Sequence, residues 1–264
     1  MDLKLTNQHA LVTGGSKGIG LACARALLVE GVRVSLVSRD PGNLSKAKAD
    51  LLATHPQAKI HTVSANLSVA TEAEAAIDEA QNALGPIDIL VTSAGAAKRT
   101  PPHELVAQSW HDAMDAKYFS YIHVLGPVSA QMAERGRGAI VNVIGAGGKV
   151  ANPIHMPGGA ANAALMLVTA GMAAAYADKG LRVNAVNPGA TLTERLHEGL
   201  TAQARMEGTD VQEATRRANA RIPMGRMAEP EEIANAVVFL ASPKASYISG
   251  AVVTMDGVSH PIVV

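Results

Sequence analysis

The stretch Thr13-Gly14-Gly15-Ser16-Lys17-Gly18-Ile19-Gly20 decides the fold. It follows a short apolar run and precedes a helical pattern over Leu21–Glu30. Gly14 permits a tight turn, Gly18 lets the backbone approach a phosphate, and Gly20 lets the helix pack close to the strand. The helix N-terminus then offers free N–H groups to a pyrophosphate. Because the glycines lie between a strand and a helix, they predict a dinucleotide site rather than a merely structural turn.

Seven short apolar runs rich in β-branched residues alternate with longer helical patterns along the 264 residues. Continuous apolar strands with helical crossovers predict one doubly wound α/β domain over residues 1–264, with a seven-stranded parallel sheet covered by helices on both faces. The least regular stretch, at about 193–227, is expected to act as a lid. The predicted strands are His9–Val12, Val32–Val37, Lys59–Val63, Ile87–Val91, Ala139–Ile144, Arg182–Val186 and Ala251–Met255.

The end of the second predicted strand bears on the choice of cofactor. An acid commonly stands there in NAD-binding sites, where it holds the ribose hydroxyls. This chain has Ser38 and Arg39 instead, and Lys17 is expected within reach. A guanidinium suits a 2′-phosphate, so the sequence favours NADP(H) over NAD. The alternative interpretation is that Arg39 and Lys17 are two solvated surface cations.

Composition excludes several classes of function. The formal net charge of +0 gives no attraction to nucleic acid or to an anionic membrane. No apolar run in the sequence reaches the length of a membrane span. No Cys/His cluster has metal-ligand spacing, and the single cysteine, Cys23, is interpreted as a small buried hydrophobe. A reducing cytoplasm is the expected location.

With these residues in hand, the chain resembles the short-chain dehydrogenase/reductase family over nearly its whole length. Besides the glycine turn, the resemblance rests on Ala65–Ser68, Thr92–Gly95, Arg182–Gly189 and the tail Arg226–Gly257. It implies a nicotinamide cofactor and, together with the glycine turn, a set of binding residues. These are Gly14, Ser16, Lys17, Gly18, Ile19, Gly20, Ser38, Arg39, Asn66, Leu67, Ala94, Gly95, Asn162, Pro188, Gly189, Thr191 and Thr193.

The catalytic positions that the resemblance implies carry unusual residues. The family places a Tyr four residues before a Lys on one helix, where both side chains share a face. Counting from flanking motifs puts Gly158 at the Tyr position, Asn162 at the Lys position, Gly145 at the Ser position and Lys117 at the Asn position. No Tyr-x3-Lys sequence occurs anywhere in the chain. Carbonyl reduction by the usual route of the family is therefore not expected.

Three residues are candidates to replace the missing groups. His155 lies three residues before Gly158 and has an ordinary pKa suited to proton transfer. Lys149 follows the fifth strand, and Lys117 lies on the helix behind it. Each has a plainer interpretation: His155 as a pocket wall, Lys149 as a solvated side chain, and Lys117 as a buried cation with a partner. Asn162 is expected to bind the nicotinamide ribose.

Three functions remain open on this sequence. The first is an atypical NADP(H)-dependent oxidoreductase that acts on a small carbonyl or alcohol whose identity the sequence does not give. The second is an inactive NADP(H)-binding scaffold or sensor, and the third is a lyase or isomerase in the same pocket. The resemblance further implies a homotetramer formed through helices over Trp110–Glu134 and Gly158–Lys179, whose Ala-rich faces allow close approach.

Overall fold

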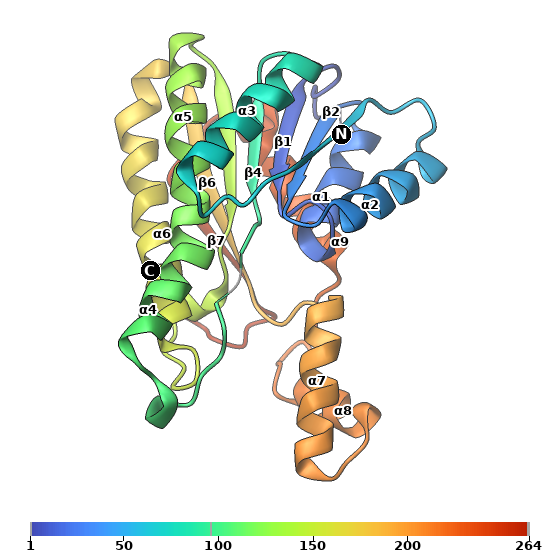
Figure 1. The fold of residues 1–264 in the computed structure, drawn as a ribbon, viewed down its shortest axis with the longest axis vertical. Coiled ribbons are helices and arrows are strands. Elements are labelled where there is room, and N and C mark those ends of the chain that lie inside the picture. Colours follow the sequence, from blue (N-terminus) through green and yellow to red (C-terminus); the bar gives the residue numbers. More distant parts are fainter. Residues whose placement is uncertain (1, 96, 263–264) are drawn as a thin grey trace.

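The computed structural model describes residues 2–95 and 97–262, apart from the side chains of residues 202, 203 and 206. Its sheet has seven parallel strands, as predicted, and their order is β3-β2-β1-β4-β5-β6-β7 (Figure 1). The order reverses between β1 and β4, and in sheets of this kind the carboxyl ends of the strands at such a reversal are the usual place of a ligand. The strands are β1 (His9–Thr13), β2 (Arg33–Ser38), β3 (Ile60–Ser64), β4 (Ile89–Thr92), β5 (Gly138–Val143), β6 (Leu181–Pro188) and β7 (Val252–Met255).

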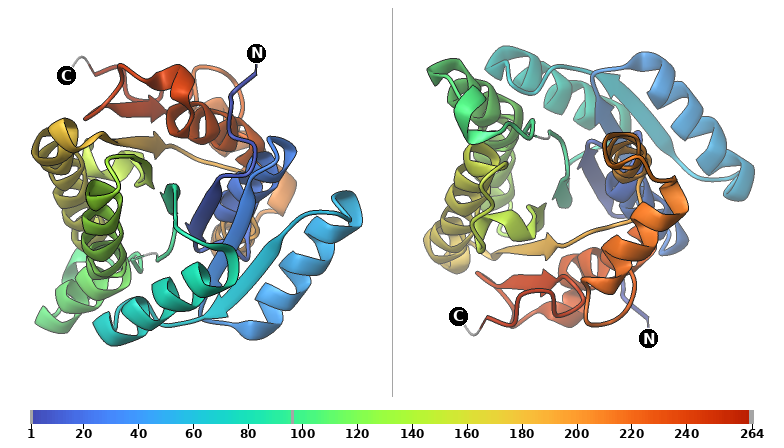
Figure 2. Two further views of the ribbon diagram at one scale, coloured as in Figure 1. Left: turned by 90° about the horizontal axis from the view of Figure 1, so that it is seen from above. Right: turned by 90° about the horizontal axis from the view of Figure 1, so that it is seen from below.

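Helices cover both faces of this sheet (Figure 2). Helices α1, α2 and α9 pack on one face, and α3, α5 and α6 pack on the other. The α-helices are α1 (Gly18–Val29), α2 (Pro41–Thr54), α3 (Ala70–Leu84), α4 (Ala107–Ala113), α5 (Ser120–Glu134), α6 (Met156–Tyr176), α7 (Glu194–Glu207), α8 (Val211–Ala220) and α9 (Pro230–Ala241). Short 3₁₀ turns are η1 (Pro102–Glu104), η3 (Ala146–Gly148), η4 (Ala177–Lys179) and η5 (Pro243–Ala245).

Two helices differ from the sequence expectation, one in where it begins and the other in being interrupted. Helix α1 begins at Gly18, inside the glycine turn, three residues before the predicted helical pattern. The predicted helix over Trp110–Glu134 is divided, because a π-helical segment, η2 (Met114–Phe119), separates α4 from α5. This wider turn lies against the end of β4, where the backbone of Gly95 approaches Ala116 closely. Local structure near the site therefore departs from regular helix where two backbones meet.

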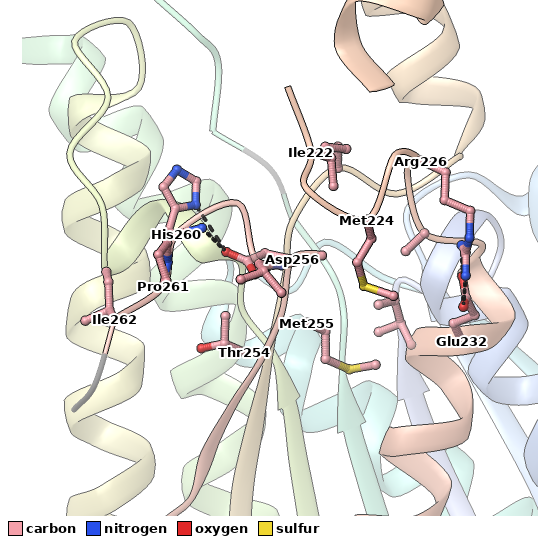
Figure 3. A pocket seen from close by; sticks show the side chains of 15 residues that line it. Ile222, Met224, Arg226, Glu232, Thr254, Met255, Asp256, His260, Pro261 and Ile262 are labelled. Carbon is pink, nitrogen blue, oxygen red and sulfur yellow. Dashed lines mark hydrogen bonds and ion pairs between the residues drawn. The ribbon is translucent and has the colours of Figure 1, made fainter. Parts of the chain in front are cut away.

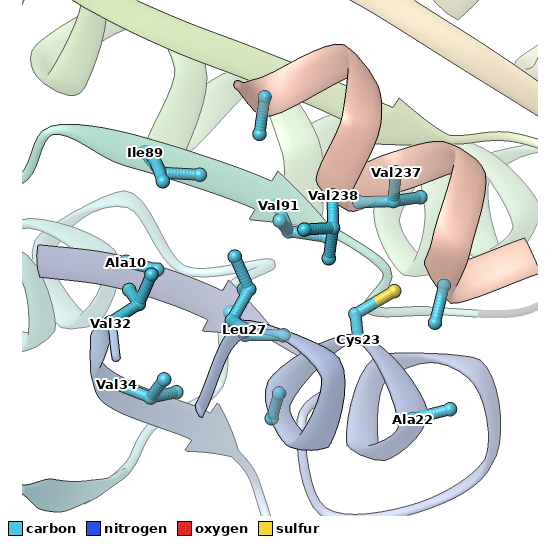
Figure 4. Close-up of a cluster of buried hydrophobic side chains, with 14 of the residues drawn as sticks. Ala10, Ala22, Cys23, Leu27, Val32, Val34, Ile89, Val91, Val237 and Val238 are labelled. Carbon is cyan, nitrogen blue, oxygen red and sulfur yellow. The ribbon is translucent and has the colours of Figure 1, made fainter. Parts of the chain in front are cut away.

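Small aliphatic side chains fill the core between α1, α9 and the sheet (Figure 4). Cys23 and Leu27 on α1 meet Val237 and Val238 on α9, and all four are buried. Burial raises the pKa of the Cys23 thiol to about 12. The interpretation of Cys23 as a buried small hydrophobe is therefore confirmed, since such a thiol stays protonated and unreactive.

Helices α7 and α8 project from the body of the molecule beyond the carboxyl edge of the sheet (Figure 1). They pack on each other around a small apolar cluster that contains Leu200, Ile222 and Met227. The segment expected to act as a lid is thus a helical hairpin, which we call the α7–α8 hairpin.

One helix within the described residues, Met156–Lys179, is long and apolar enough to cross a membrane by length and composition. A core helix passes the same test. Leu165, Thr169 and Ala173 of this helix are buried in the fold, whereas Leu167 on its outer side is 77% exposed. The helix thus packs on the sheet with one face and leaves an apolar face outward.

Candidate functional site

The glycine turn has the geometry that its sequence predicts. Gly14 has φ +65°, and a Cβ there would lie 2.6 Å from the carbonyl oxygen of Ser93 at the end of β4. Gly18 has φ +53°, which L side chains rarely adopt. A Cβ on Gly20 would lie 2.3 Å from the carbonyl oxygen of Gly14, so α1 starts in direct contact with the turn. Three glycines are therefore required by sterics at this junction.

The N-terminus of α1 presents backbone donors that no side chain satisfies. Its N-cap residue is Lys17, which makes no capping hydrogen bond. Beside it, the Ser16 hydroxyl donates to Ser38 Oγ at 2.9 Å, which joins the turn to the end of β2. This arrangement of free N–H groups and a partial positive charge fits a pyrophosphate.

The end of β2 lacks an available acid. The acid that follows is Asp40, whose carboxylate caps α2 by accepting a hydrogen bond from Asn43 N at 2.6 Å. Arg39 lies between Ser38 and Asp40, and its side chain is exposed. A carboxylate that already caps a helix is less available to a ribose hydroxyl, whereas the exposed guanidinium is free to meet a phosphate.

Lys17 has a partner of its own. Its Nζ lies 2.9 Å from Glu194 Oε2, and both side chains are more than half exposed. The hydrogen bond to Glu194 raises the pKa of Lys17 and lowers the pKa of Glu194. A Cβ on Gly18 would lie 3.2 Å from Thr193 Cγ2. The first turn of α7 therefore lies beside the glycine turn, with Glu194 at Lys17 and Thr193 next to Gly18.

The remaining predicted cofactor residues line the same edge of the sheet. Asn66 Oδ1 accepts from the Ser68 hydroxyl at 2.9 Å, so the acceptor expected to face adenine is engaged within its own loop. Gly95 cannot carry a side chain, because its Cβ would lie 1.7 Å from Ala116 O. The other members are Ile19 in α1, Leu67 beside Asn66, Ala94 after β4, and Pro188, Gly189 and Thr191 at and after the end of β6.

The ring of His155 occupies the place above Gly158. A Cβ on Gly158 would lie 2.2 Å from His155 Cε1 and 2.6 Å from Nε2. The other side of the ring faces Gly147, whose Cβ would lie 3.2 Å from Cδ2. The imidazole is thus held between two glycines, and any larger residue at 158 would displace it. The structure places His155 at the predicted Tyr position itself, not merely near it in sequence.

The two nitrogens of His155 differ in their surroundings. Nδ1 is buried without a hydrogen-bond partner among the described residues, so Nε2 is the nitrogen available to a ligand. Burial lowers the pKa of His155, and the charges of Arg99, Arg195 and Lys117 lower it further. Near neutral pH the ring is therefore neutral and carries its proton on Nε2, because a buried N–H without an acceptor is costly.

Asn162 and Gly145 face each other across the same place. Asn162 is buried, and its Nδ2 lies 3.2 Å from the position of a Cβ on Gly145. Gly145 has φ +134°, and its N–H donates to Asn187 Oδ1 at 3.3 Å. The amide of Asn162 thus fills part of the space beside Gly145 and remains able to hydrogen-bond a ribose.

Lys117 is a buried amine with polar partners. It is 7% exposed, and its Nζ donates to Tyr121 Oη at 2.7 Å and to Val143 O at 3.1 Å. Burial lowers the pKa of Lys117 to about 7, and the charge of Arg195 adds to the effect. Its amine therefore exchanges a proton near neutrality, which an ordinary solvated lysine does not do.

Lys149 is not brought to this place. Its Nζ donates to Thr254 Oγ1 on β7 at 3.2 Å, and the interaction is exposed. Of the three candidate catalytic residues, the structure brings together His155 and Lys117 and directs Lys149 to the β7 side.

Two arginines near His155 were missed by the sequence analysis. Arg99 follows β4, and Arg195 lies in the first turn of α7. Arg195 Nη2 donates to Ala97 O at 3.3 Å, across 98 residues of sequence. Both follow carboxyl ends of strands, where parallel α/β sheets bind ligands, and that position was the signal that could have found them.

Two cavities lie near this edge. One of about 300 Å³ flanks the glycine turn and is lined by Ser16, Lys17 and Gly18 together with residues of α2, α9 and 192–194. Another of about 460 Å³ lies at the end of β7 and is lined by the ion pair Arg226–Glu232 and by the hydrogen-bonded pair Asp256 and His260 (Figure 3). The larger cavity contains none of the predicted site residues, so cavity volume alone does not identify the candidate site.

Comparison with known proteins agrees with this geometry. The sequence profile of a family described as Enoyl-(Acyl carrier protein) reductase matches residues 14–259. The 2-(S)-hydroxypropyl-CoM dehydrogenase 3 of Xanthobacter autotrophicus is 35% identical over 97% of this chain and 98% of its own length. The chain belongs to the short-chain dehydrogenase/reductase family of oxidoreductases.

Two solved structures show how closely the fold is shared. L-sorbose reductase from Gluconobacter frateurii, complexed with NADPH and L-sorbose, has a TM-score of 0.94 with 26% identity, and each chain is covered completely. An NADPH-bound short-chain oxidoreductase from Pseudomonas aeruginosa, described as containing an atypical catalytic center, has a TM-score of 0.89 and 30% identity. That match covers 97% of this chain and 98% of the other.

Proposed function

We propose that this protein is an NADP(H)-dependent oxidoreductase that interconverts a carbonyl and an alcohol without the Tyr-x3-Lys pair of its family. His155 takes the place of the phenol. The observation that carries the proposal is the imidazole between Gly147 and Gly158, with Nε2 as its available nitrogen. The solved relative with an atypical catalytic center supports it by showing NADPH bound in such a protein.

The cofactor preference follows from the end of β2. Ser38 and Arg39 replace the usual acid, and Asp40 is engaged as the cap of α2. Because Lys17 pairs with Glu194, Arg39 is the cation that meets the 2′-phosphate. NADPH complexes of L-sorbose reductase and of the Pseudomonas protein support the same choice, and NAD is the less favoured alternative.

In this proposal the bound cofactor transfers the hydride, and side chains of the protein transfer the proton and hold the cofactor. A bound nicotinamide supplies hydride to the carbonyl carbon or accepts it in the reverse direction. In its doubly protonated form, His155 gives its Nε2 proton to the reduced oxygen and keeps the proton on Nδ1, and in oxidation the neutral ring takes a proton back on Nε2. Asn162 hydrogen-bonds the ribose, and Lys117 supplies positive charge behind the imidazole when it is protonated.

The test replaces His155 by Gln, which keeps a polar group but cannot transfer a proton at neutral pH. A positioned general acid contributes roughly 10²–10⁴-fold, so H155Q is expected to lose about that factor in kcat while NADPH affinity is unchanged. NADPH oxidation is followed with a panel of carbonyl compounds. The matched control is His103→Gln, an exposed histidine in η1. Equal kcat in H155Q and the control would remove His155 from the reaction.

The same measurements separate the two other functions that fit the site. An inactive scaffold or sensor would show a higher melting temperature with NADPH and turnover at background. A lyase or isomerase would form product without any change in NADPH absorbance. Either result would replace the oxidoreductase proposal.

The α7–α8 hairpin completes the proposal as a lid. Its first turn touches the glycine turn through Thr193 and the loop after β4 through Arg195. A hairpin anchored at both places can close over a bound dinucleotide and exclude water. We place the reaction in the cytoplasm, where a lone buried thiol such as Cys23 stays reduced.

A further inference from the structure

Four basic side chains from four different segments converge beside the predicted reaction centre. Arg99 comes from the loop after β4, Lys117 from η2, His155 from the N-terminus of α6, and Arg195 from α7. The charges of the other three all act on His155, and Arg99 also acts on Arg195. Two fixed positive charges, Arg99 and Arg195, therefore act together at this place, beside two groups that can become positive, His155 and Lys117.

Direct contacts place Arg195, His155 and the loop that carries Arg99 together, since the Thr100 N–H donates to Ile154 O at 2.9 Å. Arg195 Nη2 donates to Ala97 O at 3.3 Å, which holds the start of α7 over the loop after β4. The Cβ position of Gly158 lies 2.7 Å from Ala97 Cβ and 2.6 Å from His155 Nε2. Ala97 therefore accepts a hydrogen bond from Arg195 and lies beside Gly158, against which the ring of His155 also lies.

The cluster is not neutralised by the protein. Within residues 2–95 and 97–262, none of the four basic residues forms an ion pair. Among the described residues, Glu198 is the carboxylate whose charge acts on Arg195, and the charges that act on His155 and Lys117 are those of basic groups. Like charges brought together without counterions cost free energy, and such arrangements recur where an anion is to be bound.

We propose that the substrate of this site carries an anionic group, a carboxylate or a phosphate, which Arg99 and Arg195 hold while its carbonyl or hydroxyl meets His155. This rests on the proposed function, since His155 is taken as the proton donor. Guanidinium groups bind carboxylates and phosphates through paired hydrogen bonds, and two of them set both affinity and orientation. The substrate class is thus an oxo or hydroxy acid, or a phosphorylated ketone or alcohol.

The bound anion favours protonation of its neighbours. The pKa of Lys117 is about 7 in the free protein, and an anion beside it raises that value. Lys117 also faces Tyr121 and Arg195, while His155 faces Arg99 and Arg195. Binding therefore takes up protons, and affinity for the anion is expected to fall as pH rises through 7.

The experiment compares each acid with its neutral counterpart. Calorimetry on the NADPH complex uses 2-oxobutanoate, acetoacetate and 4-oxopentanoate with their methyl esters, and dihydroxyacetone phosphate with dihydroxyacetone. At least one charged member is expected to bind roughly ten-fold or more tightly than its partner. The ester pairs and the phosphate pair distinguish the two kinds of anion. NADPH oxidation is recorded with the same compounds.

Variants test whether the stronger binding of the charged compounds depends on Arg99 and Arg195. Arg99→Gln and Arg195→Gln are each expected to remove most of the charge preference, whereas Arg221→Gln, an exposed arginine outside the cluster, leaves it intact. If the anions bind but NADPH is not oxidised, the proposed oxidoreductase function is contradicted, whereas the proposed anion site is supported. Titrations of the protein without cofactor keep this test independent of NADPH binding. Equal binding of every acid and its neutral partner, or a preference unaffected by both site variants, would overturn the inference.

Discussion

Lys117 is a residue at which burial costs the fold electrostatic stability. Its amine is buried with Tyr121 Oη and Val143 O as partners, and it has no carboxylate among the described residues. Burial therefore works against the charged form, and the pKa falls to about 7 from its ordinary value of 10.5. A cost of this kind is retained where a group serves a ligand rather than the fold.

A change in the pH dependence of stability follows for Lys117→Met. Between pH 7 and 10.5 the unfolded chain binds a proton at Lys117 that the folded protein lacks, so the free energy of unfolding rises with pH. The slope from this group approaches about 1.4 kcal/mol per pH unit and is absent in K117M. Urea unfolding from pH 6 to 10 measures both slopes. Parallel curves would show that Lys117 titrates normally in the folded protein.

At the scale of elements, the junction of β1 and α1 depends on backbone contact. Gly20→Ala is expected to open the glycine turn, since its Cβ would lie 2.3 Å from Gly14 O, a backbone atom that cannot rotate away. We expect a loss of about 1–3 kcal/mol in stability and failure of NADPH to raise the melting temperature.

The matched control for the glycine junction is Gly199→Ala in α7. Its Cβ meets nothing within 4 Å, so the variant should gain up to about 1 kcal/mol through helix propensity. Thermal unfolding with and without NADPH measures both variants. An NADPH-induced stabilisation of G20A as large as that of G199A would show that the close contact is dispensable.

At the scale of the whole molecule, the outer face of α6 predicts assembly. Leu167 is 77% exposed among Ala160, Ala163 and Ala170, and an apolar helix face with small residues allows another helix to approach closely. We propose that α5 and α6 form the interface of a homotetramer.

The assembly prediction is tested with Leu167→Glu. A carboxylate at the centre of the interface cannot be desolvated cheaply, so the variant should lower the molar mass towards that of the 27.2 kDa chain. The control is Val29→Glu, an apolar residue that is 66% exposed at the end of α1. Light scattering after size exclusion gives the mass. A wild-type monomer would contradict the prediction outright.

Only part of the site could be predicted from the sequence. The predicted residues lie at the ends of neighbouring strands, whereas the missed ones are brought in from distant segments. The glycine turn, Ser38 and Arg39 lie at ends of neighbouring strands, so strand order alone brought them together. The approach of Arg195 to Ala97 spans 98 residues and depends on where the α7–α8 hairpin leaves the sheet. No local pattern encodes that contact, so both arginines were missed.

The seven strands, their parallel arrangement and the dinucleotide junction could be predicted from the sequence, because hydrophobic periodicity and glycine sterics act over a few residues. The sequence also predicted that Gly158 and Asn162 stand where a phenol and an amine are usual. Only the tertiary structure decided that the imidazole of His155 lies against Gly158 and that the charges of Arg99, Lys117 and Arg195 act on it. Those positions are set by the packing of four distant segments, and packing is a property of the folded chain.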